Sequence, residues 1–188
     1  QHKDFARQFG DLAVHPGIPG PDGHPEVIHI HADATSTRIA GEDWHSDTAM
    51  VEAPPMGAIL FAIEVPDYGG DTLFASQAHA YDALSDGMKQ MIADLKVVNS
   101  DIRVAGPTTT RNQNRTTKSR MDADWVATET AHPVVRTHPE TSRKSLYCDR
   151  SYSIRFEGMT EEESAPLLDY LMDWGTQPEF TCRFRWRK

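Results

Sequence analysis

Residues 57–63 form the longest apolar run of the chain, and it restricts the possible folds strongly. The strand that it predicts, 57–65, closes at Pro66. A continuous apolar strand is usually covered on both faces, so the run predicts a buried sheet. It is far shorter than the roughly 20 residues that a membrane-spanning helix needs. The 188 residues suffice for one domain with a sizeable core.

Short strands are expected to outnumber helices. Alternating or short apolar segments predict four more strands, at 26–31, 133–137, 145–149 and 181–187. The second and third are joined by a plausible hairpin turn at 139–142. In the last strand, the side chains expected to face the core are those of Cys182, Phe184 and Trp186. A lone strand cannot pair its backbone, so this strand needs partners from elsewhere.

Three helices are predicted, at 3–10, about 85–95 and 160–175. Ser85 is the expected N-cap of the second, and Thr160 with Glu163 forms a capping box for the third. A helix thus opens the chain and a strand closes it, so both ends are expected to continue in the native protein. The predicted fold is mainly β with flanking helices, in a single domain of residues 1–188.

The charge balance restricts the partners. The formal net charge is −9, from 28 acidic and 19 basic residues, which argues against a nucleic-acid partner. No apolar signal region precedes the first helix, so a cytoplasmic protein without membrane association is expected. The two cysteines, Cys148 and Cys182, are expected to be buried thiols in strands, not a disulfide framework.

Residues 104–124 are polar and lack any periodicity. Their composition is typical of a mobile surface loop. The functional alternative is a flexible lid whose Arg and Lys side chains meet an acidic substrate. The sequence leaves both interpretations open.

The sharpest chemical feature is His45-Ser46-Asp47, which follows Trp44. In an extended segment, residues i and i+2 point to the same side, so an imidazole and a carboxylate are presented together. Two histidines and one carboxylate on one face of Fe(II) leave three positions open, for a bidentate acid and for dioxygen. His-x-Asp alone occurs by chance in many proteins, so its context decides its weight.

Several blocks in one order resemble the taurine dioxygenase family. They are listed by range: Asp43–Asp47, Ala53–Pro55, Gly69–Leu73, His132–Pro139 and Pro178–Phe180. Together they span nearly the whole chain. The stretches Glu64–Thr72 and Leu146–Cys148 also resemble the aryloxyalkanoate dioxygenase branch.

The resemblance implies a double-stranded β-helix, or jelly roll, with iron at one open end; here it would be incomplete at both ends. His45 and Asp47 would be the first two iron ligands and the catalytic centre. Thr72 would donate its hydroxyl to a carboxylate of 2-oxoglutarate. The alternative for Thr72 is a structural hydroxyl at the start of a strand, after the Gly69-Gly70 turn.

Two residues fall where relatives place substrate contacts. His15 matches a histidine that binds the acidic head group, although it could instead cap a loop before Pro16. Tyr152 matches an aromatic residue of the substrate pocket, with core filling as the equal alternative. Ile18 and Gly41 depart from the tyrosine and asparagine of the taurine enzymes, so taurine itself is disfavoured as the substrate.

The third metal ligand is absent from the candidate set. In the family it is a late histidine, followed by an arginine that binds 2-oxoglutarate, and both are expected beyond Lys188. His132 and His138 belong to a block that looks structural and are not expected to bind metal.

The function implied is an Fe(II)- and 2-oxoglutarate-dependent dioxygenase that uses O2. It would hydroxylate a small organic acid resembling an aryloxyalkanoate and release succinate and CO2. An alkyl sulfonate or sulfate dioxygenase is the alternative enzyme. A non-catalytic β-helix binding protein is the alternative of another class, if the native chain ends at Lys188. A homo-oligomer is also expected.

Overall fold

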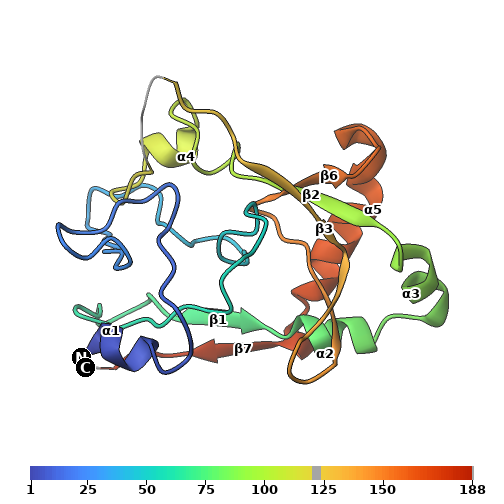
Figure 1. The fold of residues 1–188 in the computed structure, drawn as a ribbon, viewed down its shortest axis with the longest axis horizontal. Helices are drawn as coiled ribbons and strands as arrows, with labels where there is room; N and C mark the ends of the chain where they lie inside the picture. Colours follow the sequence, from blue (N-terminus) through green and yellow to red (C-terminus); the bar gives the residue numbers. More distant parts are fainter. Residues whose placement is uncertain (120–123, 188) are drawn as a thin grey trace.

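The computed structural model describes residues 1–119 and 124–187 (Figure 1). Within these residues, seven strands outnumber five α-helices, so the chain is mainly β with few helices. The strands are β1 (Thr72–Ala75), β2 (Lys96–Ser100), β3 (Glu129–Pro133), β4 (Val135–Thr137), β5 (Lys144–Leu146), β6 (Ser153–Phe156) and β7 (Thr181–Phe184). The helices are α1 (His2–Ala6), α2 (Gln77–Asp82), α3 (Asp86–Ile92), α4 (Thr110–Gln113), α5 (Glu161–Gly175) and the 3-10 helix η1 (Pro178–Phe180).

A packed unit is built on the antiparallel sheet β3-β2-β6, with α5 beside it (Figure 1). Val97 of β2 and Phe156 of β6 lie opposite each other and are almost completely buried. Leu171 of α5 packs into the same cluster, together with Ile92 from the end of α3. We call this unit, residues 77–100 and 129–175, the packed unit. Burial of its apolar side chains is the main source of stability.

The helix predictions for the packed unit are confirmed. Ser85 caps α3 by accepting from the Met88 backbone N–H. Thr160 and Glu163 form the predicted capping box of α5. The apolar stripe of α5 faces inward, as its helical spacing requires.

The predicted hairpin is also confirmed. β4 and β5 pair antiparallel, with Val135 opposite Leu146. The turn between them includes Ser142, which has a positive φ of 56°. The observed strands are shorter than the predicted ones, because the backbone of Tyr147 turns back to donate to Val134 and leaves the β4–β5 ladder.

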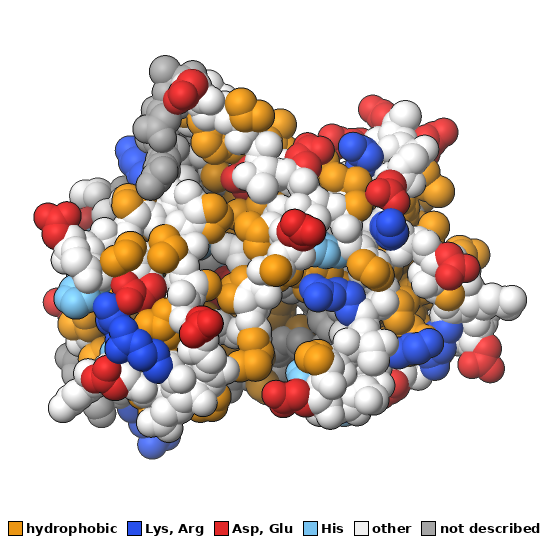
Figure 2. All heavy atoms as spheres, in the orientation of Figure 1, with side chains coloured by type: hydrophobic (Ala, Val, Ile, Leu, Met, Phe, Trp, Pro, Cys, Tyr) orange, Lys and Arg blue, Asp and Glu red, His pale blue; other side chains and the backbone are white. Residues whose placement is uncertain are grey.

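Two predicted strands, 57–65 and 26–31, were wrong. Both segments lack regular structure, and Phe61 and Ile63 are each 75% exposed. A strand needs a neighbour to pair with its backbone, and no strand of the described residues lies beside 57–65. Apolar composition predicted burial here without supplying the partner. Hydrophobic side chains are correspondingly open on the face drawn in Figure 2.

The last predicted strand exists as β7, paired antiparallel with β1. Its predicted inward face was wrong, since Cys182 is exposed and Phe184 is 50% exposed. The expectation of two buried thiols therefore fails for Cys182, while Cys148 is partly buried. The pair β1–β7 is a separate two-stranded sheet with no further strand over this face in the described part of the chain. No helix there is long and apolar enough to cross a membrane.

Candidate metal and cosubstrate site

The segment His45–Asp47 lies in coil between the N-terminal region and the packed unit. His45 Nε2 is 3.3 Å from Asp47 Oδ1, so the imidazole and the carboxylate lie on one side of the backbone, as predicted. The other ring nitrogen, Nδ1, is 2.7 Å from the carbonyl oxygen of Asp43. Because a carbonyl only accepts, Nδ1 carries the proton and Nε2 presents its lone pair beside Asp47. Metal-binding histidines are commonly oriented in this way.

The two side chains also shift each other's protonation. The hydrogen bond to Asp47 raises the pKa of His45 above its ordinary value, against the opposing effect of burial. The same hydrogen bond from His45 lowers the pKa of Asp47. The pair is therefore an ion pair in the metal-free protein when the imidazole is protonated, and a cation must displace that proton to bind.

Asp149 holds this segment from the side of the packed unit. Its side chain is 7% exposed, and Oδ2 accepts from the backbone N–H of Ser46 at 3.1 Å. Oδ1 accepts from the N–H groups of Ser151 and Tyr152, both at 2.8 Å. Burial raises the pKa of Asp149, and these three donors oppose the rise. One buried carboxylate thus joins the residue between the two candidate ligands to the strand β6 region.

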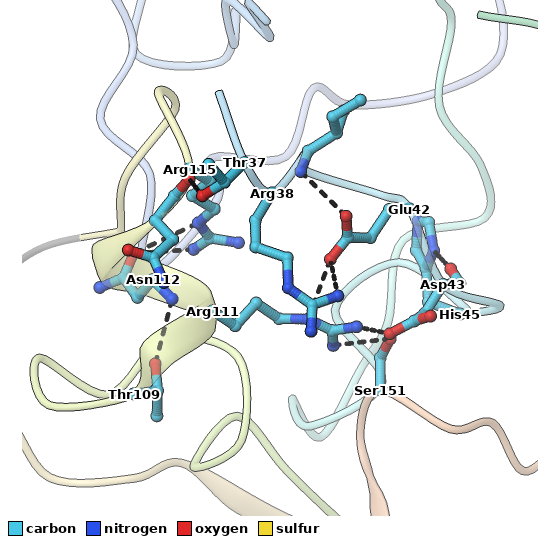
Figure 3. Close-up of polar contacts among 12 residues, drawn as sticks. Thr37, Arg38, Glu42, Asp43, His45, Thr109, Arg111, Asn112, Arg115 and Ser151 are labelled. Atoms are coloured by element: carbon cyan, nitrogen blue, oxygen red, sulfur yellow. Dashed lines mark hydrogen bonds and ion pairs between the residues drawn. The ribbon is translucent and has the colours of Figure 1, made fainter. Parts of the chain in front are cut away.

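Arg111 of α4 holds the same segment from the other side (Figure 3). Its guanidinium pairs with the carboxylate of Asp43, and Nη1 lies 3.5 Å from Ser151 Oγ. The Asp43 carbonyl is the acceptor of His45 Nδ1, so Arg111 acts on the residue that orients the imidazole. Arg38 adds an ion pair to Glu42 at 2.8 Å in the same cluster.

Gly41 lies directly against the candidate ligand. Its φ is +81°, a conformation that favours glycine, and a Cβ there would lie 3.4 Å from Cε1 of His45. A side chain at this position would therefore press on the imidazole.

His15 performs the capping role, and it also lies in the field of Asp47. Its Nδ1 accepts from the backbone N–H groups of Gly17 and Ile18, both at 3.0 Å. This leaves the proton on Nε2. Burial lowers the pKa of His15, with Asp47 opposing, so the ring is a neutral donor. Capping does not exclude substrate contact through Nε2, which stays a prediction.

The segment 104–124 is more ordered than its composition predicts. It contains α4, and Asn112, Arg115 and Ser119 are buried. Arg115 donates to Asn112 and Ser119, so a polar cluster replaces an apolar core. Part of the segment, residues 120–123, lies outside the described residues. Lid motion stays a prediction.

Tyr152 is partly buried, and burial raises the pKa of its phenol to about 12. Asp149 and Asp47 add to this rise, while Arg115 opposes it. The phenol is thus a neutral donor beside the candidate ligands. Its role as a substrate contact stays a prediction.

Thr72 begins β1, and its hydroxyl oxygen accepts from the indole N–H of Trp186 at 2.9 Å. This contact uses an acceptor position of the hydroxyl and leaves its own proton available for donation. A cavity of about 160 Å³ separates β1 from the metal segment, and its lining includes His45, Leu73, Phe74 and Asp149. Thr72 and the His45–Asp47 segment therefore lie on neighbouring parts of the fold.

Comparison with known proteins identifies this arrangement. The family model described as "Taurine catabolism dioxygenase TauD, TfdA family" matches residues 1–188. The chain belongs to the TauD/TfdA family.

Individual members of the TauD/TfdA family agree. An alkylsulfatase of Acinetobacter baylyi is 32% identical over 100% of this chain and 58% of its own length. An (S)-phenoxypropionate/alpha-ketoglutarate-dioxygenase of Sphingobium herbicidovorans is 29% identical over 97% and 64%. The crystal structure of a taurine dioxygenase from Burkholderia xenovorans matches with a TM-score of 0.75 and 33% identity, over 99% of this chain and 58% of the other. The chain spans about three-fifths of the length of these TauD/TfdA relatives.

Within the described residues, no group of three His, Cys, Asp or Glu side chains is placed to hold a metal. His132 has a structural role, as predicted: Nε2 is 2.9 Å from the Val51 carbonyl, and its ring packs edge-on against Tyr147. His138 caps the hairpin turn by accepting from Glu140. The donor set of His45 and Asp47 fits two positions of the TauD/TfdA iron site, with a third ligand still required.

Sequence reasoning missed Asp149, Arg111 and Arg115. All three act through contacts more than 25 residues apart in the chain or inside a polar segment without periodicity. The available signal was Asp149, a carboxylate directly after the apolar residues Leu146–Cys148, because a charge at a strand end is buried only where it has partners.

Proposed function

We propose that this chain is the metal-binding part of an Fe(II)- and 2-oxoglutarate-dependent dioxygenase that hydroxylates a small organic acid. The observation that carries the proposal is the 3.3 Å approach of His45 Nε2 to Asp47 Oδ1, with Nδ1 oriented by a backbone carbonyl. TauD/TfdA relatives with 2-oxoglutarate in their names support the cosubstrate.

In this proposal, His45 and Asp47 are the first two iron ligands and Thr72 binds a carboxylate of 2-oxoglutarate. Iron and 2-oxoglutarate, when bound, would supply the oxidising chemistry that consumes O2 and yields succinate and CO2. The Asp43 carbonyl keeps the proton on His45 Nδ1, so that Nε2 is free to bind. The Trp186 indole orients the Thr72 hydroxyl so that its proton is available for the cosubstrate.

The third ligand, a histidine, and the arginine for 2-oxoglutarate are proposed to lie beyond Lys188. The complete jelly roll is proposed to need the same additional residues. The exposed apolar segment 57–65 and the face of β7 support this, because both present side chains that further strands would cover.

The substrate class has two candidates. Relatives named for phenoxypropionate and 2,4-dichlorophenoxyacetate favour an aryloxyalkanoate. Relatives named as an alkylsulfatase and a sulfate ester dioxygenase favour an alkyl sulfate or sulfonate. Ile18, in the turn capped by His15, is an apolar residue and favours a substrate with an apolar body.

The test is succinate release by the full-length protein with Fe(II), 2-oxoglutarate and either an aryloxyalkanoate or an alkyl sulfate. We expect acid-dependent succinate release that falls by at least about 100-fold in Asp47→Ala, because a ligand is lost. Stimulation by alkyl sulfates alone would decide for the second substrate class. Unchanged turnover in Asp47→Ala would contradict the site. A protein without turnover under all conditions would favour a binding role.

A further inference from the structure

Arg115 is a buried cation without a carboxylate partner. Its side chain is 8% exposed, and none of the ion pairs among the described residues includes it. The more exposed Arg38, Arg103 and Arg143 each pair with a carboxylate. Charged side chains are almost never buried unless paired, because removing a cation from water costs several kcal/mol.

The partners that Arg115 does have are neutral. Nε and Nη2 donate to Asn112 Oδ1 at 3.2 and 3.1 Å, and Nη2 also donates to Ser119 Oγ at 2.6 Å. These contacts orient the guanidinium, and Figure 3 shows Arg115 beside α4 and Asn112. They do not neutralise its charge. A guanidinium has five N–H donors, and Nη1 has no printed acceptor within the described chain.

Arg115 lies at the turn that His15 caps. Its acceptor Ser119 packs against this turn, with Cβ 3.9 Å from where a Cβ on Gly17 would lie. The electrostatic effects of Arg115 and Asp47 both reach His15, and both reach Tyr152. The guanidinium therefore faces the same region as the candidate metal ligand.

The surrounding donors suit an anion. His15 is a neutral ring with its proton on Nε2, and the Tyr152 phenol is neutral. Asp47 is the nearby carboxylate, and its charge would be used by the metal. A tetrahedral or planar oxyanion accepts charge-assisted hydrogen bonds from a guanidinium better than any neutral group does.

We infer that Arg115 binds the acidic head group of the substrate, a sulfate, sulfonate or carboxylate, beside the metal site. This inference rests on the proposed function and names a substrate contact for it. It also gives the segment 104–124 a role, since the anion would be bound by the polar cluster of α4 and not by a mobile surface.

The experiment uses the full-length protein with Fe(II) and 2-oxoglutarate under anaerobic conditions. The charge-transfer absorption of the iron–2-oxoglutarate complex reports the proposed function, and its perturbation by sodium hexyl sulfate or 2-phenoxypropionate reports acid binding. In Arg115→Gln we expect an unchanged initial band and an acid affinity weakened roughly 10- to 100-fold. Arg143→Gln, which removes an exposed arginine far from the site, is the matched control and should leave both unchanged.

The outcomes separate the two claims. No band in the wild type would mean that the proposed function fails. A normal band with unweakened binding of both acids in Arg115→Gln would overturn the inference. A structure of the full-length protein with one of its own carboxylates on Arg115 would overturn it as well.

A second measurement covers the case in which Arg115→Gln does not fold. Side-chain ¹⁵Nε resonances of arginine are recorded in the wild type, and Arg115→Lys assigns the signal. We expect the Arg115 signal to shift on addition of hexyl sulfate. A signal that stays in place while the acid binds would overturn the inference.

Discussion

The packed unit and the segment 10–71 are built in opposite ways. The packed unit buries Val97, Phe156 and Leu171 to within 1% exposure between a sheet and α5. The segment 10–71 has no helix or strand element, and its apolar residues near Phe61 are exposed. Yet the candidate metal ligands lie in the second region. Polar side chains from elsewhere, mainly Asp149 and Arg111, position them.

This difference teaches that stability and site geometry come from separate interactions in this chain. Apolar burial supplies the free energy of folding, whereas a few hydrogen bonds and ion pairs transfer the rigidity of the packed unit to His45 and Asp47. Substitutions in the two sets are therefore expected to have separable effects.

The largest expected effect is on stability. Phe156→Ala should lower the free energy of unfolding by about 3–5 kcal/mol, because it leaves a cavity in the core. Phe61→Ala in the 188-residue chain should change it by less than about 0.5 kcal/mol, since the side chain is 75% exposed. Urea denaturation measures both. Equal losses would contradict the exposed placement of Phe61. A large loss at Phe61 only in the longer protein would indicate that added strands cover it.

The next effect separates stability from metal binding. Asp149→Ala should weaken Mn(II) or Fe(II) binding by about 10- to 100-fold, because the Ser46 backbone loses its acceptor. Asp101 is the matched control, a buried carboxylate that accepts from the Thr128 N–H inside the packed unit. Asp101→Ala should cost similar stability, about 1–3 kcal/mol, without changing metal affinity. Calorimetric titration of the metal would distinguish them, and equal affinities in the two variants would remove Asp149 from the account.

A smaller effect is expected from Arg111. Arg111→Gln should weaken metal binding about 2- to 5-fold, the size of a partly exposed ion pair of about 0.2–1 kcal/mol. Arg150, which pairs with Asp169 and Asp173 of α5, is its counterpart within the packed unit. Arg150→Gln should leave metal affinity unchanged in the same titration. The comparison would fail if Arg150→Gln were the more damaging of the two.

The smallest effect concerns protonation. In the metal-free protein the pKa of His45 is raised by Asp47, so the stability that this pair contributes is present below pH 6.5 and is lost as pH rises through the raised pKa. Asp47→Asn should move the NMR titration midpoint of His45 downward and remove that pH dependence. An unmoved midpoint would show that the two side chains do not interact in solution.

The sequence predicted what depends on local rules. The capping box at Thr160, the N-cap at Ser85 and the hairpin β4–β5 follow from spacing and composition, and the structure confirms them. The approach of His45 to Asp47 follows from their i, i+2 spacing in the same way.

What the sequence could not predict depends on distant partners. The run 57–65 has strand composition, but pairing requires a neighbour that composition does not name. Asp149 lies 103 residues from Ser46, and no local pattern connects them. Arg115 lies in a segment without periodicity, although its burial by Asn112 and Ser119 decides what that segment can bind.

The most direct test is Mn(II) binding to the full-length protein, followed by the EPR signal of free Mn(II). We predict one Mn(II) per chain in the wild type and in His138→Gln, whose side chain caps the hairpin turn. Binding should be lost in His45→Ala and in Asp47→Ala. Undiminished binding in either of these two variants would contradict the claim that this neighbouring imidazole and carboxylate hold the metal.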